Sequence, residues 1–118
     1  MSTFFINILS WILVALYGIK GGYTKVNVKG QSIRIAVDNV RTLQRAKTYS
    51  IKEPDTLDWL DSFEPDSCFF DLGANIGQYS LYPATKFGNK IKVYAFEPQC
   101  INYYLLNRNI YLNKLEKN

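Results

Sequence analysis

The chain of 118 residues contains no histidine and only two cysteines, Cys68 and Cys100. Without an imidazole, this chain cannot by itself supply a histidine general base, a Ser-His or Cys-His nucleophile pair, or a histidine zinc ligand. The cysteines lack the spacing of metal ligands, and no secretory signal is evident. We therefore expect them to be reduced packing residues of a cytoplasmic protein, and we predict no metal site.

Clusters of charge are also missing. The 14 Lys and Arg residues outnumber the 10 Asp and Glu residues, but they are scattered along the chain, which disfavours a nucleic-acid partner. Aromatic residues make up 15% of the sequence, and most of them occupy positions that we expect in a core. An apolar content of 47% is ordinary for one small globular domain.

The most apolar stretch covers residues 4–19 and predicts a helix within an amino-terminal segment of residues 1–22. Its length is at the short limit for a membrane span, and it lacks the flanking features of a signal peptide. Three interpretations stay open for this helix. It packs on the domain or on a partner, it contacts a membrane, or it is a frayed tail.

Residues 23–66 are expected to form a hairpin and helices ahead of the main unit. Apolar and polar residues alternate over residues 25–37, as in the strands of a half-buried β-hairpin. Gly30-Gln31 lies between the two alternating runs and predicts a two-residue turn with glycine in the first position.

Two helices are expected after the hairpin. The pattern over residues 40–49 is weak, and its basic residues are expected to lie mostly in solvent: Arg41, Arg45 and Lys47. Pro54 and the acids beside it mark the start of a clearer helix. One stripe of that helix has the spacing of a buried face: Thr56, Trp59, Leu60 and Phe63.

Residues 67–118 follow the order strand, glycine loop, helix, strand, helix. Apolar runs predict strands over 68–72 and 90–96, with a helix between them that follows Gly77 and extends to about residue 87. Pro83 either kinks that helix or lies in the first turn of a helix that Ser80 caps. The last helix covers 99–112, and one side of it is expected to face inward: Ile101, Tyr104, Leu105 and Leu112. An open α/β sheet builds a nucleoside pocket in this order, at the carboxyl ends of its strands.

The glycine loop between the two strands has the properties of a ligand site. Gly73 and Gly77 allow the backbone to turn sharply and to approach a ligand, and the following helix directs free N–H groups toward it. Glu97, at the end of the second strand, can accept hydrogen bonds from both hydroxyls of a ribose. Asp71, at the end of the first, can orient the loop or bind a cationic group.

The spacing of the loop disfavours two other nucleotide sites. A G-x-G-x-x-G dinucleotide fingerprint starting at Gly73 would need glycine at positions occupied by Asn75 and Gln78. A Walker phosphate loop would need a Gly-Lys-Ser/Thr sequence, which is absent after the loop.

The motifs of this region resemble the first two motifs of S-adenosylmethionine-dependent methyltransferases, and more narrowly those of the FkbM-type family: Asp71-Leu72-Gly73-Ala74-Asn75-Ile76-Gly77, Tyr79-Ser80-Leu81 and Tyr94-Ala95-Phe96-Glu97-Pro98. The likeness extends to Lys52-Glu53-Pro54-Asp55-Thr56 and to the closing Leu106-Asn107-Arg108-Asn109-Ile110-Tyr111-Leu112-Asn113. It covers roughly residues 35–115.

The resemblance implies a Rossmann-like methyltransferase fold, S-adenosylmethionine as cofactor, and a sugar oxygen or a small metabolite as methyl acceptor. The loop from Gly73 to Gly77, with Ala74 and Asn75, would lie against the methionine and ribose. Glu97 would accept the ribose hydroxyls, and Asp71 would lie near the amino group of the cofactor. Glu53 is either a pocket residue or an acid at a helix start. The simpler alternatives are a tight strand–helix turn at the glycines and a surface acid at Glu97.

The resemblance stops after the second strand and its helix. The later strands of the family, which contact the adenine and shape the acceptor pocket, have no counterpart here, and no residue stands out as catalytic. We therefore expect an amino-terminal, incomplete portion of a methyltransferase that cannot catalyse by itself. The alternative is a non-catalytic remnant whose exposed sheet edge or apolar helix binds another chain or a membrane.

Overall fold

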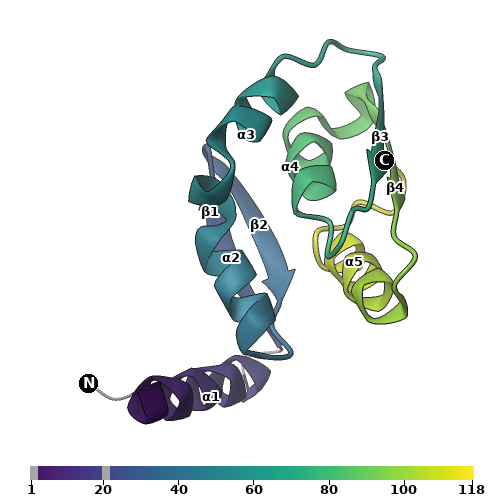
Figure 1. Cartoon of the computed structure of the whole chain (residues 1–118). Helices are drawn as coiled ribbons and strands as arrows, with labels where there is room; N and C mark the ends of the chain where they lie inside the picture. Colours follow the sequence, from purple (N-terminus) through teal and green to yellow (C-terminus); the bar gives the residue numbers. More distant parts are fainter. Residues whose placement is uncertain (1–2, 20–21) are drawn as a thin grey trace.

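The computed structural model describes residues 3–19 and 22–118, with side chains from residue 8 to residue 16 in the first of these ranges (Figure 1). Its elements in chain order are α1 (Thr3–Ile19), β1 (Tyr23–Val28), β2 (Gln31–Ala36), α2 (Val40–Lys52), α3 (Pro54–Asp61), β3 (Cys68–Leu72), α4 (Gln78–Phe87), the 3-10 turn η1 (Gly88–Lys90), β4 (Lys92–Phe96) and α5 (Cys100–Leu112). The predicted order of helices and strands is confirmed. Residues 1–2 and 20–21 of the expected amino-terminal segment lie outside the described ranges.

The chain is an α/β protein with two small sheets. Strands β1 and β2 form an antiparallel hairpin, and β3 pairs with β4 in parallel. Helices α4 and α5 lie between the hairpin and the β3–β4 sheet, and α2 lies along the hairpin (Figure 1). The β3–α4–β4–α5 order is compatible with part of a Rossmann-like fold. One core cluster joins the two sheets across the helices, from Val28 and Ile33 in the hairpin to Leu81 in α4 and Phe69 in β3.

The hairpin turn differs from the predicted one by one residue. Val28 pairs with Gln31, so the two turn residues are Lys29 and Gly30 rather than Gly30 and Gln31. Both have positive φ, 47° at Lys29 and 87° at Gly30, as a type I′ turn requires. The side-chain oxygen of Asn27 accepts a hydrogen bond from the Gly30 N–H at 2.9 Å. Glycine therefore takes the second position of the turn, where this bond holds it.

Helix α4 begins at Gln78, directly after the left-handed Gly77, and it contains Pro83 in its interior. The alternative of a later helix capped by Ser80 is wrong. Pro83 lacks the N–H that would bond to the carbonyl of Tyr79. The hydroxyl of Ser80 instead donates to Asp71 at 2.6 Å, so it links α4 to β3 and does not cap a helix.

Only one face of the β3–β4 sheet is covered. Phe69 is buried beneath α3 and α4, whereas four large side chains are exposed on the other face by 47% to 78%: Phe70, Leu72, Tyr94 and Phe96. The ring of Phe70 stacks on that of Tyr94, with centroids 5.0 Å apart. The expectation that most aromatic residues lie in the core is therefore wrong for this sheet, where the rings pair with each other at the surface.

Three expectations about packing are wrong in part. Helix α3 buries Leu57 with Leu60, and Trp59 stays 54% exposed. Helix α5 buries Leu105, as expected, together with Leu106 and Asn109, and the expected Leu112 packs against the core. Ile101 and Tyr104 lie in solvent. Both cysteines are free but exposed, because Cys68 opens β3 and Cys100 opens α5.

Helix α1 extends away from the rest of the chain and touches α2 and β1 (Figure 1). It exposes five large apolar side chains: Ile8, Leu9, Trp11, Ile12 and Leu16. Among the residues with described positions, no helix has the length and apolar character needed to cross a bilayer. Contact between residues 4–19 and a membrane stays a prediction.

Candidate functional site

The glycine loop connects the end of β3 to the start of α4 and passes beside the end of β4. The backbone N–H groups of Gly73 and Ala74 both donate to the carbonyl of Phe96, at 2.8 and 2.9 Å. The loop then turns through residues with positive φ, 57° at Asn75 and 89° at Gly77, and enters α4. These bonds place the loop at the carboxyl ends of two adjacent parallel strands, where open α/β sheets bind their ligands.

The two glycines of the loop meet different surroundings. A Cβ at Gly77 would lie 2.5 Å from Leu106 Cδ1, so this glycine allows α4 and α5 to approach closely. A Cβ at Gly73 would meet no atom within 4 Å. Gly73 has a φ of 84°, and it lies at an open position beside the strand ends. Gly77 therefore allows α4 to pack closely on α5, and Gly73 leaves space where a ligand can approach the backbone.

The structure brings Glu97 and Asn75 together. One carboxylate oxygen of Glu97 accepts from the Asn75 N–H at 2.7 Å, and the other accepts from the Gln99 N–H at 2.8 Å. Glu97 therefore links the glycine loop to the start of α5 through these two hydrogen bonds. Each carboxylate oxygen can accept more than one hydrogen bond, so ribose hydroxyls can still bind there.

Asp71 and Ala74 contribute to the site mainly by hydrogen bonds that hold β3, the glycine loop and α4 together. Asp71 accepts the hydrogen bond from Ser80 and so links β3 to the first turn of α4. Ala74 is buried, and its carbonyl accepts from the Gly77 N–H at 2.8 Å. The side chain of Ala74 points into the protein, so only its backbone can face a ligand.

Glu53 lies at the junction of α2 and α3 and beside Tyr79 in α4. Burial, together with the charge of Glu53 and a hydrogen bond to it, raises the pKa of Tyr79 to about 12. Glu53 occupies the position before α3, where its carboxylate accepts from the Thr56 hydroxyl at 3.3 Å but makes no cap bond to the backbone of the helix. The structure thus places Glu53 against the first turn of α4 rather than against the glycines.

Sequence reasoning missed one residue of the site, Arg45. Its Nη1 donates to Asn75 Oδ1 at 2.6 Å, and its carbonyl accepts from Gln78 Nε2 at 2.9 Å. Burial and the charge of Arg41 lower the pKa of Arg45, while Glu97 raises it. Arg41 and Arg45 are four residues apart and share one face of α2. That spacing was the available signal, but it did not indicate which element the face contacts.

Known proteins provide a limited comparison. The sequence matches no protein-family model and no curated protein significantly. The structure is similar to the crystal structure of a candidate transferase from Pyrococcus horikoshii, with a TM-score of 0.56 and 26% sequence identity. The similarity covers 80% of this chain and 33% of the Pyrococcus chain, so it spans about a third of that protein.

Proposed function

We propose that this chain carries the S-adenosylmethionine-binding part of a methyltransferase, which transfers a methyl group to an oxygen of a sugar or another small metabolite. The observation that supports it best is the pairing of Glu97 with Asn75 beside the open Gly73. An acid at the end of one strand and an unobstructed glycine at the end of its neighbour suit a ligand that contains a ribose. The named function of the Pyrococcus protein supports the broader class of transferase.

The proposed roles follow from these contacts. Glu97 would accept hydrogen bonds from the ribose hydroxyls while it holds the loop, and the backbone at Gly73 would contact the cofactor. Asp71 would attract the amino group of the methionine part. The cofactor supplies the reactive methyl group when it is bound. The protein's contribution is to hold the acceptor oxygen in line with that group, which is where most of the rate gain in such a transfer can arise.

The acceptor side is proposed to be built by further protein. Phe70, Leu72, Tyr94 and Phe96 form an exposed apolar face, which is the kind of surface that α/β proteins cover with helices. The Pyrococcus chain is about three times as long as the part that matches. We propose that the 118 residues bind the cofactor but do not catalyse transfer alone.

Calorimetric titration of the chain tests the ligand class. We expect saturable binding of S-adenosylmethionine and of S-adenosylhomocysteine, and no binding of NAD. Binding of NAD without S-adenosylmethionine would make the methyltransferase proposal wrong. Glu64, an exposed acid outside the site, provides a matched control: Glu97→Gln should weaken binding, whereas Glu64→Gln should not.

A non-catalytic interaction module is the second candidate, and the exposed apolar side chains of α1 favour it. Deletion of residues 1–20 and flotation with vesicles separates the two. An interaction module that ignores S-adenosylmethionine would lose its association with vesicles on deletion. A cofactor-binding unit would keep its affinity for the cofactor.

A further inference from the structure

A pocket of about 410 Å³ lies between α1, the start of α2 and the start of α5. Its walls include Trp11 from α1, Arg41 and Arg45 from α2, and Gln99 and Ile101 from the start of α5. None of the residues predicted to bind the cofactor lines this pocket. The pocket adjoins the glycine loop, because Arg45 donates to Asn75 and the Gln99 N–H donates to Glu97, but other residues line it. It is therefore a second place where the described part of the chain can receive a small group.

The charged residues that line this pocket are of one sign, although Glu97 outside it acts on Arg45. Arg41 and Arg45 both line it, and no carboxylate does. The ion pairs found among the described residues involve Lys29, Lys86 and Arg108, and neither of these two arginines. Two guanidinium groups on adjacent turns of a helix repel each other, so an anion between them would relieve an unfavourable arrangement. Arg45 is held in place by Asn75, which fixes its direction before a ligand binds.

The neutral polar groups of the pocket also favour an anion. The side-chain oxygen of Asn39 already accepts from the Thr42 N–H, and that of Gln99 accepts from the Asn102 N–H. In each of these caps the NH2 group of the amide can still donate, and the oxygen can accept one further hydrogen bond. The Thr42 hydroxyl is occupied by bonds to the backbone of Asn39 and Asp38. The donors available in the pocket are thus the guanidinium groups of Arg41 and Arg45 and amide NH2 groups.

We propose that this pocket binds the phosphate group of a ligand. Arginine forks match the geometry of phosphate oxygens, and a phosphate accepts several hydrogen bonds at once. Trp11 and Ile101 flank the pocket and are 62% and 61% exposed, so they can contact an apolar or ring-shaped part of the ligand. Two sources share this chemistry, a soluble phosphate ester and the headgroup of an anionic phospholipid. The proposal does not rest on the proposed cofactor.

Two binding arms distinguish the sources. In the first, glucose 1-phosphate and inorganic phosphate are titrated into the whole chain by calorimetry. In the second, the chain is sedimented with vesicles of phosphatidylglycerol and phosphatidylcholine, and with vesicles of phosphatidylcholine alone. Saturation in the first arm identifies a soluble ester. Binding restricted to the phosphatidylglycerol vesicles identifies the headgroup, and Trp11→Ala should then weaken it.

The double variant Arg41→Gln/Arg45→Gln tests the site in whichever arm gives binding, and it should lose at least about tenfold in affinity, as expected for lost charged hydrogen bonds. Lys47→Gln/Lys52→Gln removes the same charge from the same helix at residues outside the pocket and should change affinity by less than about twofold. Equal losses in both double variants, or no binding in either arm, would overturn the proposal. If the arginine variant unfolds, Arg41→Lys/Arg45→Lys keeps the charge without the fork and should still bind more weakly than the wild type.

Discussion

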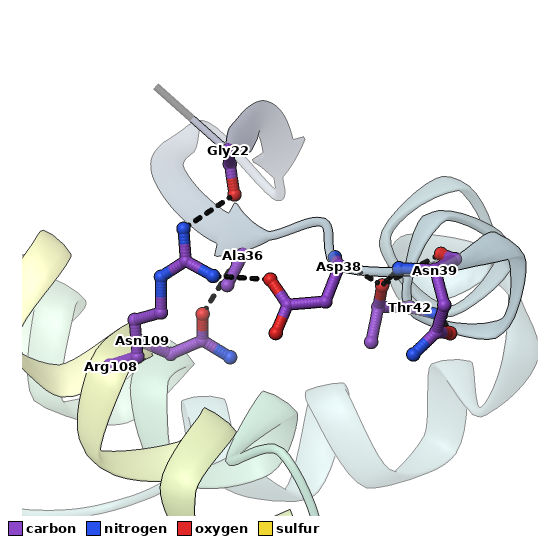
Figure 2. A network of polar contacts seen from close by, with 7 residues as sticks. All are labelled: Gly22, Ala36, Asp38, Asn39, Thr42, Arg108 and Asn109. Carbon is purple, nitrogen blue, oxygen red and sulfur yellow. Dashed lines mark hydrogen bonds and ion pairs between the residues drawn. The ribbon is translucent and has the colours of Figure 1, made fainter. Parts of the chain in front are cut away.

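The side-chain oxygen of Asn109 accepts a hydrogen bond from the backbone N–H of Ala36 at 2.7 Å (Figure 2). The NH2 group of the same side chain donates to the carbonyl of Ile76 in the glycine loop at 2.8 Å. One turn further on, Asn113 both donates to and accepts from the backbone of Arg34. The carboxamides of Asn109 in α5 and of Asn113 directly after it therefore bond to the open edge of β2, as a third strand would. That of Asn109 also fixes the loop.

Asn109→Ala is expected to lower the free energy of unfolding by about 2 kcal/mol, because it leaves a buried N–H and a buried carbonyl without partners. Urea unfolding measures this loss, and hydrogen exchange should show reduced protection of the Ala36 amide. Asn107→Ala, two residues away on the exposed side of α5, is the control and should change stability by less than about 0.5 kcal/mol. Equal effects of the two variants would contradict the structural role of Asn109.

Gly77→Ala and Gly73→Ala should separate packing from ligand binding. At Gly77, backbone strain adds to a clash with Leu106, so we expect a loss of about 3 kcal/mol in stability. At Gly73 the strain acts alone, and the loss should be about 1–2 kcal/mol. Because the new methyl group at Gly73 would project into the open space, Gly73→Ala should weaken S-adenosylmethionine binding more than its loss of stability explains. Thermal unfolding and calorimetry provide the two measurements. A larger loss of stability at Gly73 would contradict this division of roles.

Local patterns in the sequence were sufficient to predict the order of elements. The strands around residues 68–72 and 92–96 and the glycine loop between them follow from apolar runs and glycine positions, which depend on neighbours in the chain. Local pattern also predicted the hairpin. It placed the turn one residue too late, because the hydrogen bond that selects Lys29-Gly30 comes from the side chain of Asn27.

Contacts between distant segments were not predictable in the same way. Asn109 and Asn113 resemble surface residues in a hydrophobicity pattern, but they face inward because β2 needs partners for its edge. Of the predicted buried side of α5, Leu105 is confirmed, whereas Ile101 and Tyr104 are exposed because the helix also turns Asn109 inward. Arg45 likewise resembles a solvated helix residue in the sequence pattern, but in the folded chain it donates to Asn75 of the loop.

Glu97→Gln tests the hydrogen bonds by which Glu97 links the loop to the start of α5. Glutamine keeps one acceptor oxygen and replaces the other with an NH2 group, so one of the two backbone N–H groups, at Asn75 or Gln99, loses its partner. We expect faster exchange of that amide by NMR, and a loss of about tenfold or more in affinity for S-adenosylmethionine. Faster exchange with unchanged affinity would restrict Glu97 to a scaffold role and remove it from the proposed cofactor site.

A cluster around Asp61 should make stability depend on acidic pH. Burial raises the pKa of Asp61, but hydrogen bonds from Lys29, Lys86 and Tyr82 outweigh it and hold the pKa well below its ordinary value. A carboxyl group with a lowered folded pKa contributes stability that is complete above its unfolded pKa, near 4, and is lost as pH falls toward the folded pKa. Urea unfolding should therefore show Asp61→Asn to be less stable than wild type by about 1 kcal/mol at pH 7, with the difference shrinking below pH 4. Asp58→Asn, on the same helix but more exposed, should show a smaller difference. A constant gap between wild type and Asp61→Asn from pH 7 to pH 2 would mean that the ionised cluster is not its source.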